Sequence, residues 1–116
     1  MTWGTVELEP EVAEWLAGLD DKRWAQALMH LDLLEQQGVH LGEPYTRQLD
    51  GKLRELRFYC GGERVRITYW ITSGRRIVML TEFHKTKMRE FAEVERARQA
   101  MKRCQAEGHT ADEEEL

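Results

Sequence analysis

The segment LRELRFYCGGERVRITYWITSGRRIVMLTEF, residues 53–83, decides the fold, because its apolar side chains recur at strand spacing between glycine turns. Residues 53–59 and 64–72 alternate apolar and polar side chains, and Gly61-Gly62 between them is a hairpin signal. After a second turn, residues 77–80 are apolar on both faces, as in a central strand covered from both sides. We therefore predict three consecutive antiparallel strands.

Two helices are predicted before these strands and one after them. Pro10 is in the favoured first-turn position of a helix, and Asp20 or Asp21 caps a second helix that ends near Gln37. The third helix is predicted from about Met88 to Gln105, with acidic residues early and basic residues late.

The remaining segments complete the predicted topology. Residues 5–8 alternate like a short first strand, whereas residues 39–52 contain glycine, proline and an Asp-Gly pair and are expected to be mostly loop. The predicted order is β-α-α-β-β-β-α. This is an α+β fold in which a helical hairpin and a C-terminal helix pack on a small antiparallel sheet.

The size and composition fit one domain. The chain has 116 residues, of which 41% are hydrophobic and 33% charged, a balance that fits neither a disordered chain nor a membrane protein. Its N-terminus lacks the features of a signal peptide, so we expect a cytoplasmic protein with no membrane partner. The domain is expected to span residues 1–105, and the acidic segment 106–116 to be disordered.

The net charge of −4 conceals a strong segregation of charge along the chain. Residues 1–46 have two basic and nine acidic residues, a balance of −7, and residues 104–116 have a balance of −5. Residues 47–103 have fifteen basic and seven acidic residues, a balance of +8. A basic middle segment favours a polyanion-binding surface, although an ordinary solvated surface with clustered charges is an alternative.

Two arginines in the basic segment are candidates for phosphate binding. Arg57 and Arg66 are on adjacent predicted strands, and the alternation points both away from the apolar face. Guanidinium groups hold phosphate oxygens in pairs and stabilise charge that develops on a phosphoryl centre. The alternative is a structural role, as an ion pair with Glu55 or Glu63 or as a solvated edge.

Proton-transfer and base-stacking candidates lie nearby. His84 follows the central strand and can exchange protons near neutral pH, while Lys85 beside it can hold a phosphate backbone, unless the segment is simply a basic strand end. Tyr59 shares the face of Arg57. Trp70 shares the face of Arg66 and is a base-stacking candidate, with packing under the last helix as the alternative. The candidate RNA-binding residues are Lys87, Arg54, Arg64, Tyr59 and Trp70.

The two cysteines have no metal-ligand spacing and no evident base partner. Cys60 and Cys104 are therefore expected to be buried, inert thiols. No set of histidines has the spacing of a metal site, and no phosphate-binding glycine loop is present, so neither a metal nor a cofactor is expected.

Four segments, in this order, resemble the RelE/ParE superfamily of toxins. They are LDGKLRELRF (49–58), ERVRITYW (63–70), RIVMLTEFHKTK (76–87) and EVERARQAM (93–101). Within the superfamily the chain is most similar to the HigB-like, phage-derived branch, and the resemblance covers roughly residues 3–105.

The resemblance implies a toxin of a bacterial type II toxin–antitoxin pair. RelE-like members enter the ribosomal A site and cleave the mRNA there, without a metal. The mRNA 2′-hydroxyl attacks the adjacent phosphate and a 5′-hydroxyl leaves. The implied partners are the ribosome, its mRNA and a cognate antitoxin, expected to be a helix-turn-helix protein encoded by an adjacent gene.

The resemblance also assigns roles to individual residues. Arg66 matches the family's phosphate-stabilising arginine on the middle strand, and Arg57 matches the arginine that closes the ELR strand. Lys85 and Lys87 match two basic positions after the last strand. The chain departs from the family pattern at three positions, because Leu53 and Glu55 replace two lysines of RelE and Phe91 replaces a tyrosine. If the chain cleaves RNA, His84 is then the best-placed acid or base, with Tyr59 second.

Two other functions remain open from the sequence. One is a ParE-like toxin that inhibits DNA gyrase without nuclease activity, and the other is an inactive toxin fold that only binds an antitoxin. The acidic residues 1–46 are expected to lie away from RNA, where they would help to dock a basic antitoxin segment.

Overall fold

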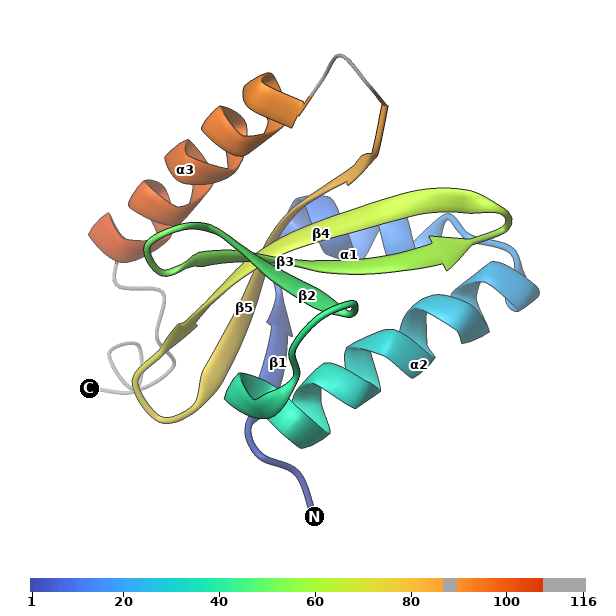
Figure 1. Cartoon of the computed structure of the whole chain (residues 1–116), viewed down its shortest axis with the longest axis horizontal. Coiled ribbons are helices and arrows are strands. Elements are labelled where there is room, and N and C mark those ends of the chain that lie inside the picture. The colour runs from blue at the N-terminus through green and yellow to red at the C-terminus, as the bar shows by residue number, and fades with distance from the viewer. Residues whose placement is uncertain (87–89, 108–116) are drawn as a thin grey trace.

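In the computed structural model, which describes residues 1–86 and 90–107, a five-stranded sheet is flanked by helices on both faces (Figure 1). The strand order is β1-β5-β4-β3-β2. The elements in chain order are β1 (Thr5–Leu8), α1 (Pro10–Ala17), α2 (Asp21–Gln37), a 3₁₀ turn η1 (Gly38–His40), β2 (Thr46–Asp50), β3 (Leu53–Cys60), β4 (Glu63–Thr72), β5 (Arg76–His84) and α3 (Glu90–Ala106). The predicted α+β class is confirmed.

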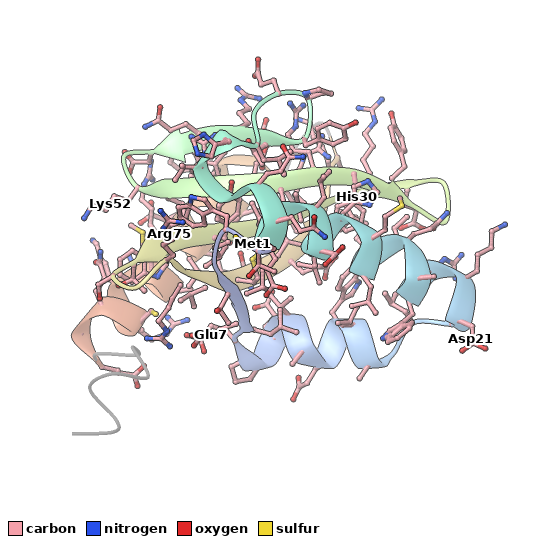
Figure 2. The ribbon with its side chains drawn as sticks, turned by 90° about the horizontal axis from the view of Figure 1, so that it is seen from below. Met1, Glu7, Asp21, His30, Lys52 and Arg75 are labelled. Carbon is pink, nitrogen blue, oxygen red and sulfur yellow. The ribbon has the colours of Figure 1, made fainter. Side chains whose placement is uncertain are left out.

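The sheet separates two apolar clusters, and these define its two faces. We call the side that α1 and α2 cover the hairpin face (Figure 2); its sheet residues include Leu56, Phe58 and Ile67. We call the other side the α3 face, where Leu53 and Trp70 pack against Ala97, Ala100 and Cys104 of the last helix. Because side chains alternate along a strand, consecutive residues of β3 belong to opposite faces.

The helix boundaries follow from local chemistry that the sequence predicts. The Asp20 carboxylate accepts a hydrogen bond from the Arg23 backbone N–H at 2.9 Å and so caps α2. α2 stops at Gly38, whose φ of +51° favours glycine, and a Cβ there would lie 2.1 Å from the Trp3 ring. α3 ends at Ala106. Its predicted start at Met88 and residues 108–116 of the predicted disordered segment 106–116 lie outside the described residues.

β2 corrects the prediction that residues 39–52 are mostly loop. The segment TRQLD, from Thr46 to Asp50, pairs antiparallel with β3 as an edge strand. Its side chains are mainly polar, and an edge strand held by backbone pairing needs no apolar alternation. β1 also differs from an all-antiparallel sheet, because it pairs in parallel with β5.

The central hairpin forms as predicted. Gly61 and Gly62 have φ values of +60° and +82°, the combination that a tight two-residue turn requires. The turn fixes the register so that Arg57 is directly opposite Arg66.

Two further features of the described residues bear on the sequence predictions. Cys60 and Cys104 are buried, and burial raises the pKa of both thiols, as expected of inert cysteines. Among the helices described, none has both the length and the apolar character needed to span a membrane.

Candidate functional site

Three arginines from three neighbouring strands gather on the α3 face. Arg57 on β3 is opposite Arg66 on β4, and Arg47 on β2 is opposite Glu55 on β3. Alternation along β3 puts Glu55 and Arg57 on the same face, so all three arginines share the face of the Glu55 carboxylate. The charges of Arg66, Arg57 and Arg47 all act on that carboxylate. The predicted juxtaposition of Arg57 and Arg66 is therefore present, and β2 adds a third cation.

Glu55 is fully buried beneath the arginines. Its Oε2 lies 3.7 Å from Arg57 Nε and 3.6 Å from Arg66 Nε, distances of ion contacts rather than of hydrogen bonds. Burial raises the pKa of the Glu55 carboxyl, and the attraction of Arg66 and Arg57 only partly opposes it. Burial likewise lowers the pKa of Arg66, with Glu55 opposing it. The carboxylate thus orients the arginines, although removing the charged groups from water costs free energy.

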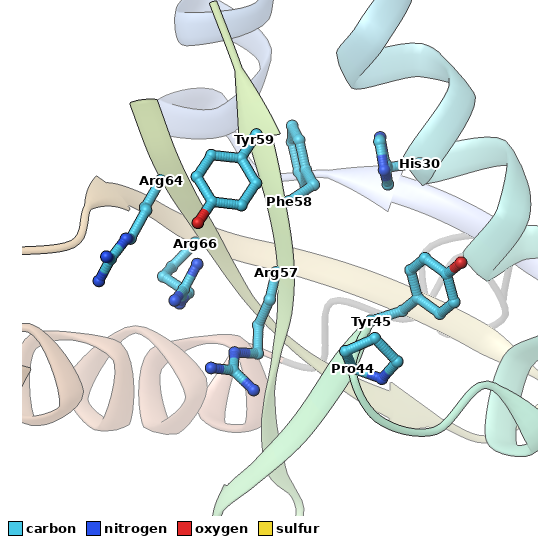
Figure 3. A pocket seen from close by; sticks show the side chains of 8 residues that line it. All are labelled: His30, Pro44, Tyr45, Arg57, Phe58, Tyr59, Arg64 and Arg66. Atoms are coloured by element: carbon cyan, nitrogen blue, oxygen red, sulfur yellow. The ribbon is translucent and has the colours of Figure 1, made fainter. Parts of the chain in front are cut away.

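The structural alternative for the arginines, an ion pair with Glu55 or Glu63, is therefore confirmed in part. The ion pair with Glu55 exists, whereas Glu63 contacts His84. The ion pair does not occupy the arginines completely, because both also line an open pocket of about 440 Å³ (Figure 3). The pocket residues are His30, Pro44, Tyr45, Arg57, Phe58, Tyr59, Arg64 and Arg66.

Lys85 approaches the same face from the end of β5. Its backbone N–H donates to the Arg64 carbonyl at 2.9 Å, and its Nζ lies 3.0 Å from Oε2 of Glu90 in the first turn of α3. The hydrogen bond from Lys85 lowers the pKa of the Glu90 carboxyl, and Arg47 and Arg66 add to the effect through their charge. The first turn of α3 therefore interacts electrostatically with the arginine cluster, by which we mean Arg47, Arg57 and Arg66.

His84 is not brought to the arginines. It is opposite Val65, which belongs to the apolar cluster of the hairpin face, so its side chain lies on the far side of the sheet from Arg66. There the imidazole lies between two carboxylates, with Nδ1 at Glu63 and Nε2 3.2 Å from Glu82. The expectation that His84 acts beside Arg66 has no support in this geometry, because one residue of strand alternation separates the two faces.

Two predicted RNA-binding residues are also placed elsewhere. Arg54 is on the hairpin face, where its guanidinium lies 3.2 Å from the Thr46 hydroxyl and 3.4 Å from that of Tyr69. Trp70 packs under α3 and is not among the residues that line the pocket, so its ring is not available to a base. The packing alternative for Trp70 is confirmed. Lys87 lies outside the described residues.

Arg64 and Tyr59 have the expected placement. Both line the pocket beside Arg66, and the Tyr59 side chain is exposed (Figure 3). Sequence reasoning missed Arg47, Tyr45 and His30. The Asp50-Gly51 pair between TRQL and KLREL is a hairpin signal that could have identified β2 and with it Arg47. No sequence signal brings His30, from the middle of α2, to this pocket.

The chemistry available at the site is that of cations and hydroxyls. Within residues 1–86 and 90–107, no three His, Cys, Asp or Glu side chains converge on a position for a metal ion. The convergent guanidinium groups suit an anion with several oxygens, such as a phosphodiester.

Comparison with known proteins gives a family and a fold. The model of the family "Phage derived protein Gp49-like" matches residues 14–105. No curated protein sequence matches the chain.

Solved structures of RelE toxins are similar to this one. The archaeal RelE–RelB complex from Pyrococcus horikoshii OT3 is 21% identical, with a TM-score of 0.57 over 72% of this chain and 97% of that chain. The toxin–antitoxin complex RelBE2 from Mycobacterium tuberculosis is 21% identical, with a TM-score of 0.50 over 71% and 98%. A double arginine-to-alanine mutant of E. coli toxin RelE in the free state is 13% identical, with a TM-score of 0.60 over 89% and 98%.

The resemblance noted in the sequence is thus matched by a family model over most of the chain and by the fold of three solved toxins. The chain belongs to the phage-derived Gp49-like family and has the fold of the RelE toxins.

Proposed function

We propose that the chain is the toxin of a type II toxin–antitoxin pair and cleaves mRNA on the ribosome. The observation that carries the proposal is the arginine cluster on the α3 face, where Arg57 and Arg66 line an open pocket and Arg47 and Lys85 lie beside them. Family and fold support a toxin of the RelE type. Two of the similar structures are complexes with an antitoxin, which supports an antitoxin partner for this chain.

The proposed reaction needs a phosphate held while its charge grows. The 2′-hydroxyl oxygen of the RNA attacks the adjacent phosphorus, the bond to the 5′-oxygen breaks, and a 2′,3′-cyclic phosphate and a 5′-hydroxyl result. One proton leaves the 2′-oxygen and one reaches the 5′-oxygen. Arg57 and Arg66 would neutralise the charge that develops on the phosphate oxygens, a contribution that such fixed donors make in many enzymes.

The proton-transfer group is proposed to be Tyr59. Its hydroxyl shares the pocket with Arg66 and Arg64, and its side chain is 65% exposed. Glu55 is buried and acts by orienting the arginines, and Lys85 is engaged by Glu90. Since His84 lies on the hairpin face, Tyr59 is the better placed of the two residues proposed from the sequence.

The charge distribution supports one orientation on the ribosome. The acidic residues 1–46 include α1 and α2, which cover the hairpin face, whereas the arginine cluster is on the α3 face. We propose that the phosphates of the RNA bind on the α3 face and that the outer surface of α1 and α2 is left for a basic segment of the antitoxin.

The test is a reconstituted translation reaction with purified protein, in which new mRNA 5′ ends are mapped with and without ribosomes. We expect in-frame cuts that appear only on translated message. Arg66→Ala should reduce the cleavage rate by roughly 10²–10³, the usual loss for one electrostatic donor. Arg103→Ala is the matched control, because Arg103 is exposed in the last turn of α3 and outside the pocket. Undiminished cleavage by the Arg66 variant would remove the arginine cluster from the mechanism.

The second candidate, a ParE-like gyrase inhibitor, is favoured by one observation. Groups that could transfer a proton are few: Phe91, which replaces the family's tyrosine in the last helix, is 80% exposed but can neither give nor take a proton, and His84 is on the other face. A supercoiling assay with purified gyrase separates the candidates. Inhibition without mRNA cleavage would select the gyrase inhibitor.

A further inference from the structure

We propose that the pocket at the edge of β3 is a nucleotide subsite in which an unstacked base packs against Tyr45 and His30 while the arginines hold the adjoining phosphate. The inference rests on the proposed RNA-cleaving function and deepens it, because it names the side chains that contact a base.

The pocket lies at the end of β3 that is not paired with β2. β2 pairs with β3 only as far as Leu56, opposite Thr46, and the Arg57 backbone N–H then donates to the Tyr45 carbonyl at 2.8 Å. The last residues of β3, 58–60, pair with β4 alone. An edge without a neighbouring strand leaves the pocket open to both faces of the sheet.

The two sides of this edge carry different chemistry (Figure 3). Arg64, Arg66 and Tyr59 lie on the side of the α3 face, and His30, Tyr45 and Phe58 lie on the other side. Arg57 extends from β3 on the same side as Arg66. A ligand that crosses the edge therefore meets cations on one side and aromatic rings on the other.

The aromatic side is rigid at its base. The rings of His30 and Phe58 are stacked, with centroids 4.6 Å apart and an interplanar angle of 11°. His30 Nδ1 lies 2.8 Å from the Gln26 carbonyl oxygen, which can only accept, so Nδ1 carries a hydrogen and donates it. Stacking and this hydrogen bond together fix the orientation of the imidazole.

Tyr45 supplies an accessible ring on a fixed backbone. Its carbonyl is bonded to the Arg57 N–H, and its side chain is 43% exposed at the pocket rim. The same backbone contact thus holds the aromatic residue beside one of the phosphate-binding arginines. Aromatic faces next to a basic groove are the usual means of binding single-stranded nucleic acids, since every base has a face that can stack.

The size and division of the pocket fit a nucleotide. Its volume of about 440 Å³ falls in the range of small-ligand sites. A nucleotide carries its 5′-phosphate and its base on different carbons of the ribose, so one group can meet the cations while the other meets the aromatic rings across the β3 edge. The carboxylates of an acidic peptide would use the arginines alone.

The test is a titration of the full-length protein, followed by NMR, with adenosine 5′-monophosphate and with ribose 5-phosphate, which carries the same phosphate and sugar without a base. We expect the nucleotide to bind roughly 5- to 150-fold more tightly, the range for one stacked base. Tyr45→Ala should abolish most of this preference and Tyr45→Phe should keep it. Trp24→Ala is the control, because Trp24 is a half-exposed aromatic residue outside the pocket.

Equal affinity for the two ligands in the unmodified protein would overturn the subsite without any variant, as would an unchanged preference in a folded Tyr45→Ala protein. Neither ribosome nor cleavage enters this measurement, so its result is separable from the proposed nuclease. A base preference without mRNA cleavage would retain the subsite and refute the nuclease. Cleavage without a base preference would do the reverse.

Discussion

The Glu55 carboxylate allows the like charges of Arg57 and Arg66 to lie next to each other. Like charges directly opposite on neighbouring strands repel, and the buried carboxylate between them offsets that repulsion. The contacts exceed hydrogen-bond length and the carboxyl pKa is raised, so burial outweighs attraction at this residue. The molecule therefore keeps a costly charge at a position where it orients two arginines.

This balance predicts how stability depends on pH. Because the folded-state pKa of Glu55 is raised above its ordinary value of 4.5, the native protein holds that proton to higher pH than the unfolded chain does. The stabilising contribution is complete below pH 4.5 and is lost as the pH rises through the raised pKa. Glu55→Gln should be at least as stable as the wild type at pH 7 and should show a flatter pH profile in urea unfolding. A clear loss of stability at pH 7 would contradict this account.

A second, partly buried glutamate, Glu82, separates the effect on stability from the effect on function. Burial also raises the pKa of Glu82, with His84 opposing it, so Glu82→Gln should flatten the pH profile in the same direction. Glu82 is opposite Ile67 and so belongs to the hairpin face. We expect Glu55→Gln to slow mRNA cleavage, because a neutral amide no longer orients the arginines, and Glu82→Gln to leave cleavage unchanged. Equal effects of the two variants on the rate would refute a positioning role for Glu55.

Among the elements, strands with apolar alternation could be predicted and the edge strand could not. The segments of β3 and β4 alternate apolar and polar side chains, and that of β5 contains an apolar run, so these strands and the pairing of Arg57 with Arg66 follow from the sequence. β2 is held by backbone pairing and has few apolar side chains, so Arg47 escaped prediction. For His84 the strand was predicted but the face was not. His84 follows Phe83, which is opposite Arg66, and alternation along β5 therefore puts the His84 side chain on the other face of the sheet.

The first turn of α3 limits the basic surface, and this predicts a gain of binding. Glu90 holds Lys85 at 3.0 Å and adds a negative charge near Arg47 and Arg66. Glu90→Gln should free Lys85 for a phosphate, raise affinity for single-stranded RNA, and steepen the salt dependence of log K by about 0.7, the value for one added contact. Fluorescence anisotropy at several salt concentrations measures both the affinity for RNA and its salt dependence.

The control for this variant is Glu95→Gln. Glu95 is on the same helix but pairs with Arg98 and Gln99, outside the arginine cluster. We expect its RNA affinity and salt slope to match those of the wild type. An equal gain from both substitutions would show that only net charge matters and would contradict a specific contact between Glu90 and Lys85.

The whole molecule divides its charge between two faces, although its net charge of −4 would oppose binding to RNA. Binding then depends on orientation, because fields from a basic and an acidic face steer a polyanion to one side only. The arginine cluster and the pocket open on the side of the free β3 edge, while α1 and α2 present the acidic residues.

A crosslinking map tests this orientation. A photoreactive amino acid at Arg64, exposed beside the pocket, should crosslink to ribosomal RNA or mRNA in a stalled ribosome complex. The same group at Met29, 62% exposed on α2, should give no RNA crosslink, and in the toxin–antitoxin complex it should crosslink to the antitoxin. Both sites are exposed, so replacing either leaves the core intact. RNA crosslinks from Met29 would place the acidic hairpin on the ribosome and reverse the proposed orientation, whereas crosslinks from Arg64 alone would tie RNA binding to the face that carries the arginine cluster.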